Sequence, residues 1–187
     1  MLALAALAVL ALASRSAPAA ATNPQRDNGM NYIPAVRTGG TDAVAWTRTR
    51  WSAARDFLAA QGYDAARAAS MAAAVVAQWA RETGWGRSEW GYNVGNVKGY
   101  QGWPGTVQRL PDGLTYRAHA TLRDGVASVI GLLEGTRYRA AWDQLARDGD
   151  AVLWYRGIIA AGYHPMTPEA LSEYASVRAR VREKVGA

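Results

Sequence analysis

The sequence lacks cysteine altogether and contains only two histidines and one phenylalanine. Without cysteine the chain has no disulfide framework, no thiolate metal site, no thiol nucleophile and no lipoprotein anchor of the lipobox type. Since His119 and His164 are the only imidazoles, a histidine-rich metal site is not expected either. The lack of disulfides does not exclude an oxidising compartment, because a protein of this size can fold without them.

The composition is that of one folded domain with a basic surface. The chain has 187 residues, of which 50% are apolar and 19% charged, so it is long enough to bury a core. Its net charge of +6 suits a polyanion such as nucleic acid, an anionic membrane or a cell-wall polymer. Eight tryptophans and nine tyrosines fit wet binding surfaces as well as cores, because their rings carry polar groups.

The N-terminal segment has the pattern of an export signal. The apolar run MLALAALAVLALA is followed by the small residues SRSAPAAA, and its length of about a dozen residues is typical of a signal-peptide core. No Lys or Arg precedes the run. Residues 1–22 are therefore predicted to be a signal peptide or an N-terminal anchor in contact with a membrane. The Pro- and Gly-containing residues 23–40 predict a linker with little structure, before a folded domain at 41–187.

The folded domain is predicted to be mainly helical. Thr41 is the expected N-cap of a helix that runs to Gln61, and Asp64 is the expected N-cap of a second helix. Further helices are predicted at 121–133, 137–147, 150–161 and from Thr167-Pro168 onward. Between the second and third helices, TVQRL and TYRAH flank the turn sequence PDG and predict two short strands. The fold class is therefore α+β, mainly α, with a small β-hairpin lobe.

Glu82 is the leading candidate for a catalytic acid. It lies three residues after Trp79 and four after Gln78, so it shares a helix face with residues expected in the core. It also lies at the helix C-terminus, just before Gly84, where the helix dipole disfavours negative charge. Both the dipole and partial burial favour the protonated form that a general acid needs. The alternative is a structural carboxylate at a helix end.

The segment that follows Glu82 is typical of a carbohydrate-binding surface. Glycines alternate there with aromatic residues: Trp85, Trp90, Tyr92, Tyr100 and Trp103. Aromatic faces stack on sugar rings, and the amides of Asn93, Asn96 and Gln101 are suited to hydroxyl and acetamido groups. Lys98 is a candidate partner for a substrate carboxylate, or a solvated charge. Trp79 and Trp85 are instead expected to fill the core beneath the loop.

These residues resemble the signature of the family-73 glycoside hydrolases, the glucosaminidases of bacterial autolysins and flagellar rod-associated muralytic enzymes. Within ARETGWG at 80–86, residues 82–86 match the E-[ST]-G-W-G part of the family pattern A-x-x-E-[ST]-G-W-G, and Y-N-L-F-G-[IV]-K is similar to YNVGNVK at 92–98. Downstream, the pattern F-R-x-Y is similar to Tyr116-Arg117-Ala118-His119, and A-G-Y is matched at 161–163. The resemblance covers roughly residues 60–180 and implies a lysozyme-like fold, in which a cleft separates the helical body from the β-lobe.

The resemblance implies cleavage of a β-1,4 bond in the backbone of N-acetylglucosamine (GlcNAc) and N-acetylmuramic acid (MurNAc), with Glu82 as the acid. It places the cleft pair of the family at Tyr92 and Asn93, and it places His119 where the family has tyrosine. The remaining residues expected to bind substrate are Trp85, Trp90, Lys98, Trp103, Tyr116 and Tyr163. No cofactor or metal is implied.

Glycosidases usually use a second carboxylate, and the sequence does not decide which residue would supply it here. The β-lobe contains one acid, Asp112, and its place in a Pro-Asp-Gly turn explains it without catalysis. Glu89 is a rival, although a loop carboxylate is expected to be exposed. The 2-acetamido group of the substrate would be the third option.

Three other functions remain as alternatives. A lytic transglycosylase needs one acid, but its usual Glu-Ser and Gly-Leu-Met-Gln sequences are absent. A wall-binding or assembly component of an envelope machine or a phage-like particle would keep the fold without catalytic turnover. In a phage-like particle the protein would be virion-associated. Nucleic-acid binding is not expected, because the C-terminal basic residues recur every two positions and spread around their helix. The leading prediction is an exported peptidoglycan hydrolase of the periplasm or cell envelope.

Overall fold

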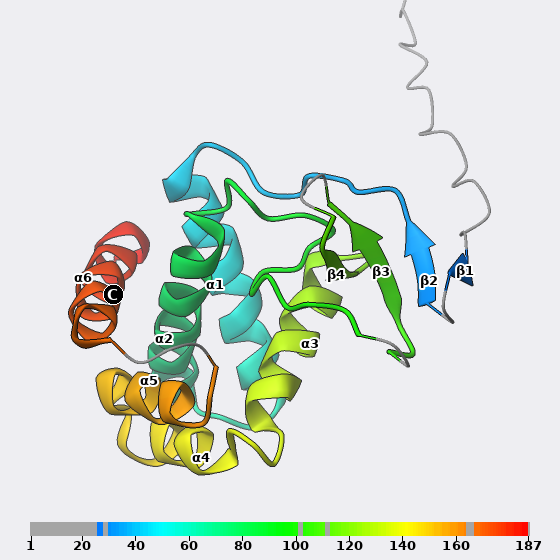
Figure 1. The fold of residues 1–187 in the computed structure, drawn as a ribbon. Helices are drawn as coiled ribbons and strands as arrows, with labels where there is room; N and C mark the ends of the chain where they lie inside the picture. Colours follow the sequence, from blue (N-terminus) through cyan, green and yellow to red (C-terminus); the bar gives the residue numbers. More distant parts are fainter. Residues whose placement is uncertain (1–25, 28–29, 101–102, 111–112, 164–166, 187) are drawn as a thin grey trace, which may run out of the picture.

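The computed structural model describes residues 26–27, 30–100, 103–110, 113–163 and 167–186. Within these residues six helices and four short strands follow the order β1, β2, α1, α2, β3, β4 and α3 to α6 (Figure 1). The helices are α1 (Ala43–Ala60), α2 (Ala65–Thr83), α3 (Leu122–Glu134), α4 (Arg139–Asp148), α5 (Ala151–Ala160) and α6 (Pro168–Val185). The strands are β1 (Arg26–Asp27), β2 (Met30–Ile33), β3 (Thr106–Arg109) and β4 (Thr115–Ala118). The prediction of an α+β, mainly helical fold with a β-hairpin is confirmed.

Helix α2 is the centre of the helical body. Every residue from Met71 to Ala80 is buried, as expected for an alanine-rich helix with no polar face. The small side chains allow α1 and α6 to pack closely on either side of it (Figure 1). The hydroxyl of Tyr174 on α6 donates to the carbonyl of Ala74 at 3.0 Å, and the Tyr174 ring stacks on that of Tyr155 with centroids 4.0 Å apart.

The helix ends follow the capping residues of the sequence with one exception. The side chains of Asp64, Thr121 and Thr167 accept hydrogen bonds from backbone N–H groups in the first turns of α2, α3 and α6, as predicted. The expectation that Thr41 caps α1 is wrong. Asp42 is the cap, because its carboxylate accepts from the backbone N–H groups of both Val44 and Ala45.

The sheet contains more than the predicted hairpin. Strands β3 and β4 are antiparallel, with Thr106 opposite Ala118. Strand β2 pairs in parallel with β3, with Asn31 opposite Thr106, and β1 extends the sheet beyond β2. Residues 30–33 therefore differ from the expected linker with little structure. Their backbone groups pair with an edge of the hairpin that would otherwise need another partner.

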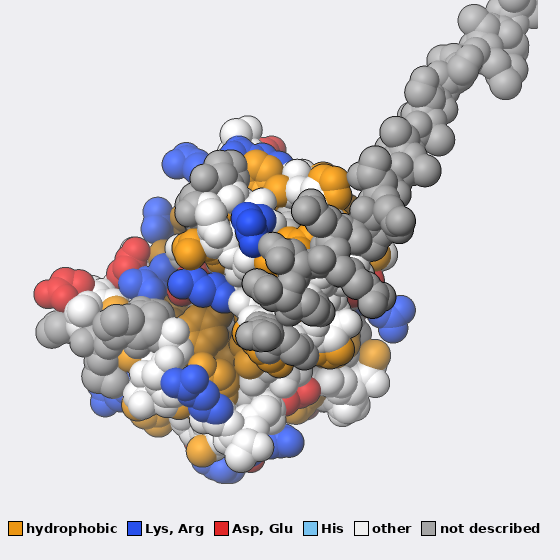
Figure 2. Space-filling model, turned by 45° about the vertical axis from the view of Figure 1, so that its right-hand side comes forward, with side chains coloured by type: hydrophobic (Ala, Val, Ile, Leu, Met, Phe, Trp, Pro, Cys, Tyr) orange, Lys and Arg blue, Asp and Glu red, His pale blue; other side chains and the backbone are white. Residues whose placement is uncertain are grey.

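A cleft separates the helical body from the sheet. The chain leaves the end of α2 and runs through the segment 84–105 to β3, while α3 lies between α1 and the sheet (Figure 1). Figure 2 shows a hollow on this side of the molecule, with an apolar floor and with Lys and Arg side chains beside it. The expected arrangement of a helical body, a β-lobe and an intervening cleft is thus present.

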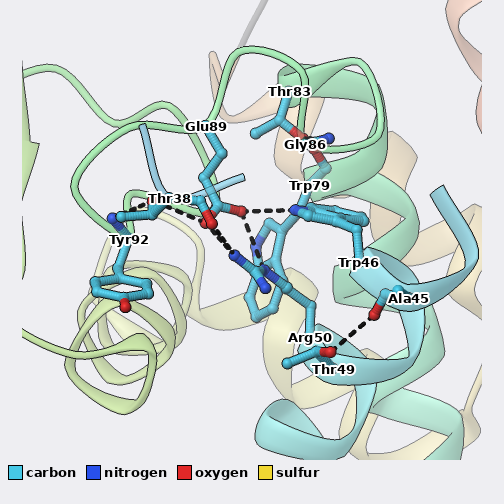
Figure 3. Close-up of polar contacts among 10 residues, drawn as sticks. All are labelled: Thr38, Ala45, Trp46, Thr49, Arg50, Trp79, Thr83, Gly86, Glu89 and Tyr92. Carbon is cyan, nitrogen blue, oxygen red and sulfur yellow. Dashed lines mark hydrogen bonds and ion pairs between the residues drawn. The ribbon is translucent and has the colours of Figure 1, made fainter. Parts of the chain in front are cut away.

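A buried carboxylate connects three separate parts of the chain. The side chain of Glu89 is 0% exposed, so the expectation that it is exposed on a loop is wrong. It accepts hydrogen bonds from Trp46 Nε1 at 2.8 Å and Thr38 Oγ1 at 3.1 Å, and it forms an ion pair with Arg50 (Figure 3). Its backbone carbonyl accepts from the N–H groups of Thr38 and Gly39, both at 3.2 Å. We call these residues (Thr38, Trp46, Arg50 and Glu89) the Glu89 cluster.

The Glu89 cluster is surrounded by backbone that leaves no room for side chains. A Cβ atom at Gly39 would overlap the carbonyl oxygen of Gly86, and a Cβ at Gly86 would overlap the indole ring of Trp46. Gly86 also has a φ of 88°, which residues with a side chain rarely adopt. The loop after α2, the N-terminal segment and α1 are therefore in direct contact at this point.

Replacing Glu89 with Gln is expected to lower the free energy of unfolding by about 3–5 kcal/mol, since it leaves the buried Arg50 without its counter-charge. Urea unfolding followed by circular dichroism measures this loss. Asp56→Asn is the control, because the exposed Arg55–Asp56 pair should contribute little. Equal losses in the two variants would contradict a special role for the buried pair.

Gly39→Ala is expected to lower the melting temperature by several degrees, because the new methyl group meets the Gly86 carbonyl. Gly40→Ala is a matched control at the neighbouring position, where a Cβ has no heavy atom within 4 Å. Thermal unfolding of both variants compares them directly. If Gly40→Ala were the more damaging change, the packing of residues 38–40 described above would be wrong.

Candidate active site

Glu82 lies in the last turn of α2, at the edge of the buried core. Its side chain is partly exposed, whereas Gln78 and Trp79, one turn earlier, are completely buried. The carbonyl oxygen of Glu82 accepts a hydrogen bond from Asn96 Nδ2 at 2.7 Å. The loop that carries Asn96 is thereby joined to the helix end that carries the carboxyl group.

Two tyrosines lie within electrostatic range of the Glu82 carboxylate. Burial raises the pKa of Tyr155 to about 12, and the Glu82 charge contributes to this rise. Burial also raises the pKa of Tyr163 far above its usual value, with Glu82 as the second cause. Both phenols therefore stay protonated near neutral pH. Tyr155 is held in place by Arg81, whose guanidinium donates to its hydroxyl at 2.8 Å.

The loop after α2 uses its polar side chains to hold its own shape. Asn93 is 1% exposed, and its side chain bonds both the N–H and the carbonyl of Val97 at 2.8 Å. This differs from the expectation that Asn93 faces a sugar. Its neighbour Tyr92 is partly buried with a φ of 51°, and its N–H donates to Thr38 Oγ1 at 2.7 Å. Tyr92 thus connects this loop to the Glu89 cluster.

Two of the predicted sugar-stacking tryptophans are in contact with cations of the chain itself. Arg180 and Lys184 of α6 lie 5.1 and 5.5 Å from the ring centroid of Trp85, which packs partly buried against the core, as expected for it. Arg37 lies 4.8 Å from the ring centroid of Trp90. Both rings are therefore cation–π partners within the protein.

A groove between β4 and α3 brings together two other predicted residues, Trp103 and His119. Its volume is about 560 Å³, and its lining residues are Trp103, Arg117, His119, Asp124, Ala127, Ser128, Gly131 and Leu132. No role was predicted for Arg117 or Asp124. The two-residue spacing between Arg117 and His119 could have indicated Arg117, because residues two apart on a strand share a face.

The remaining predicted residues are dispersed. Lys98 is exposed and forms an isolated backbone bridge with Tyr116, which is partly buried on β4. Tyr163 packs edge-on against Tyr138, with ring centroids 5.7 Å apart. Asp112 lies outside the described residues. The structure therefore brings Tyr163 beside Glu82 and brings Trp103 and His119 together in the groove.

The imidazole of His119 is held in its neutral form. Burial lowers its pKa, the nearby positive charge of Arg117 lowers it further, and Asp124 opposes both. The Nε2 atom of His119 is buried without a hydrogen-bond partner. A protonated His119 would therefore place a second positive charge in a poorly solvated position beside Arg117.

The described part of the chain contains no group of three or more His, Asp or Glu side chains that could hold a metal ion. None of the helices in the described ranges has the length and apolar character needed to cross a membrane.

The fold is that of glycoside hydrolase domains, as comparison with solved structures shows. The glycoside hydrolase domain of FlgJ from Salmonella typhimurium superposes with a TM-score of 0.59 at 20% identity, covering 78% of this chain and 94% of that one. A mutant of a peptidoglycan hydrolase from Sphingomonas sp. A1 gives a TM-score of 0.60 at 23% identity, covering 76% of this chain and 95% of that one. No protein-family model and no curated protein matches the sequence.

We expect wild-type protein to lose stability between pH 7 and pH 5 more than His119→Gln does. Because the pKa of His119 is lower in the folded state, the unfolded state binds its proton first as the pH falls below about 6.5, and unfolding is favoured. Melting temperatures at both pH values measure the difference. His164 is present in both proteins, so its contribution cancels. Parallel curves for the two proteins would contradict a buried, neutral His119.

Proposed function

We propose that this protein is a peptidoglycan hydrolase of the endo-β-N-acetylglucosaminidase type, with Glu82 as the general acid. The observation that carries the proposal is the position of Glu82. It ends the buried central helix, it follows the core at Trp79, and it lies beside the neutral phenols of Tyr155 and Tyr163. The sequence around it, ARETGWG, has the pattern found at the acid of the family-73 enzymes.

The comparisons support the same class of substrate. The similar structures include a domain named as a glycoside hydrolase and a protein named as a peptidoglycan hydrolase, with TM-scores of 0.59 and 0.60. The net charge of +6 is compatible with an anionic wall polymer. Residues 1–22 would deliver the domain to the periplasm or cell envelope, where such a polymer is found.

Glu82 would donate its proton to the glycosidic oxygen as positive charge develops on the sugar ring. A general acid must carry its proton before the reaction, and burial of a carboxyl group is a common way for a protein to achieve this. Asn96 would keep the loop of residues 92–98 at the end of α2 while the bond breaks, because its amide is bonded to the carbonyl of Glu82.

Glu89 is not available as the second carboxylate. Its oxygens accept hydrogen bonds from Thr38, Trp46 and Arg50, and the side chain is completely buried. Asp112 remains our candidate for this role. Assistance by the 2-acetamido group of the substrate is the alternative that needs no second carboxylate.

The position of Glu89 also favours a second candidate function, lytic transglycosylation. Among the described residues of 84–120, Glu89 is the only carboxylate, and it is held in the Glu89 cluster. A lytic transglycosylase needs one acid, because a hydroxyl of the substrate closes an anhydro ring in place of water. The two candidates act on the same polymer and differ in the product that they leave.

Glu82→Gln is expected to lower the release of new reducing ends from purified peptidoglycan by at least about 100-fold, since the amide cannot donate the proton. Glu183→Gln, at an exposed position of α6, removes the same charge and serves as the control, which should retain full activity. Circular dichroism and melting temperature would establish that both variants fold. Undiminished release by a folded Glu82→Gln variant would exclude Glu82 as the acid.

A further inference from the structure

We propose that the groove between β4 and α3 binds a carboxylate of the substrate, so that the protein selects glycan strands with acidic substituents over neutral ones. This inference rests on the proposed function, because it concerns the substrate of the same cleft. Two groups of peptidoglycan have this chemistry: the lactyl carboxylate of MurNAc and the carboxylates of the stem peptide. The residues that carry the inference are Trp103, Arg117 and Ser128.

Arg117 carries a buried positive charge with no carboxylate partner among the described residues. Its side chain is 7% exposed and lines the groove. Within the described ranges, its side chain makes one hydrogen bond, from Nη1 to Ser128 Oγ at 3.3 Å. A guanidinium has five N–H donors, and a buried cation is normally paired with a carboxylate. The charge of Arg117 is therefore left for a group that enters the groove.

The plane of the Arg117 guanidinium is fixed by aromatic rings. Its central carbon lies 3.8 Å from the ring centroid of Trp103 and 5.9 Å from that of Tyr100. Stacking on an aromatic face leaves the N–H edge of an arginine free for the planar, two-pronged contact that suits a carboxylate. Ser128, on the facing helix α3, holds one end of the same group.

Two hydrogen-bond donors that line the groove have no partner among the described residues. They are the Nε atom of Arg117 and the Nε1 atom of Trp103, both of which are buried and can only donate. Asp124 is the one carboxylate among the described lining residues, and it accepts from the Thr121 hydroxyl at 2.7 Å. An incoming carboxylate would supply acceptors for the Arg117 guanidinium.

The groove and Glu82 share a neighbour, Tyr163. Tyr163 lies within electrostatic range of both Arg117 and Glu82. Val129 of α3 follows Ser128 and packs against Gly95, whose position is also close to the Tyr163 hydroxyl. A strand cut at Glu82 would therefore extend a substituent toward Arg117.

The test is equilibrium binding of three small ligands to the full chain carrying Glu82→Gln, which prevents cleavage. The ligands are the disaccharide GlcNAc–MurNAc with a free lactyl carboxylate, the same disaccharide with its stem peptide, and neutral chitobiose. We expect a carboxylated ligand to bind at least about tenfold more tightly than chitobiose. Tighter binding of the first ligand assigns the lactyl group, and tighter binding of the second alone assigns the peptide.

Added to that background, Arg117→Gln should abolish the preference, and Arg117→Lys should keep part of it. Arg123→Gln is the matched control, because it removes the same charge from an exposed position on α3 outside the groove. If Arg117→Gln does not fold, nuclear magnetic resonance of the unchanged groove provides the answer. The N–H signals of Arg117 and Trp103 should shift with the carboxylated ligand and not with chitobiose.

Equal binding of all three ligands, or a preference that survives folded Arg117→Gln, would overturn the carboxylate site. The outcome is separable from that of the proposed function. Carboxylate selectivity without cleavage by the wild-type protein would support the groove and contradict the hydrolase. Cleavage without carboxylate selectivity would leave the hydrolase and remove the groove.

Discussion

The buried contact between Glu89 and Arg50 is the constraint on which the candidate site depends. The two residues come from the loop after α2 and from α1, and Thr38 adds the N-terminal segment to the same contact. Such a pair contributes little net stability, since the cost of removing both charges from water offsets their attraction. Its effect is to fix positions, because moving either residue would leave a buried charge unpaired. The position of the loop that follows Glu82 is therefore fixed at Glu89, against α1 and the N-terminal segment.

The central helix and this loop together define the environment of Glu82. The alanine-rich α2 allows α1 and α6 to approach closely, so the helix ends in a dense core and Glu82 emerges at its edge. The amide of Asn93 is hydrogen-bonded to the backbone of its own loop, and the amide of Asn96 is hydrogen-bonded to the backbone at the end of α2. Recognition of a ligand is therefore left to other groups. In our proposal such groups come from the groove between β4 and α3, which is lined by Trp103 and Arg117.

Much of the fold was predictable because its signals are local. A few consecutive residues are enough to predict the helix caps at Asp64 and Thr121. The same is true of the turn after β3 and of the spacing around Glu82. The misjudged features depend on partners far apart in the chain. The parallel pairing of β2 with β3 joins residues about 75 positions apart. The Pro- and Gly-containing sequence around β2 has no local pattern that predicts this pairing. Glu89 was expected in water, because a single carboxylate in a loop does not reveal an arginine 39 positions earlier. Arg117 was missed for the same reason, since its burial against α3, without a carboxylate partner among the described residues, follows only from the tertiary packing.

Mass spectrometry of the fragments released from purified peptidoglycan would identify the bond that the protein cleaves. We predict soluble muropeptides whose new reducing ends are GlcNAc, produced by the wild-type protein without added metal or cofactor. Products that end in anhydro-muramic acid would contradict hydrolysis and assign the protein to the transglycosylases. Intact peptidoglycan after prolonged incubation with folded protein would contradict catalysis altogether.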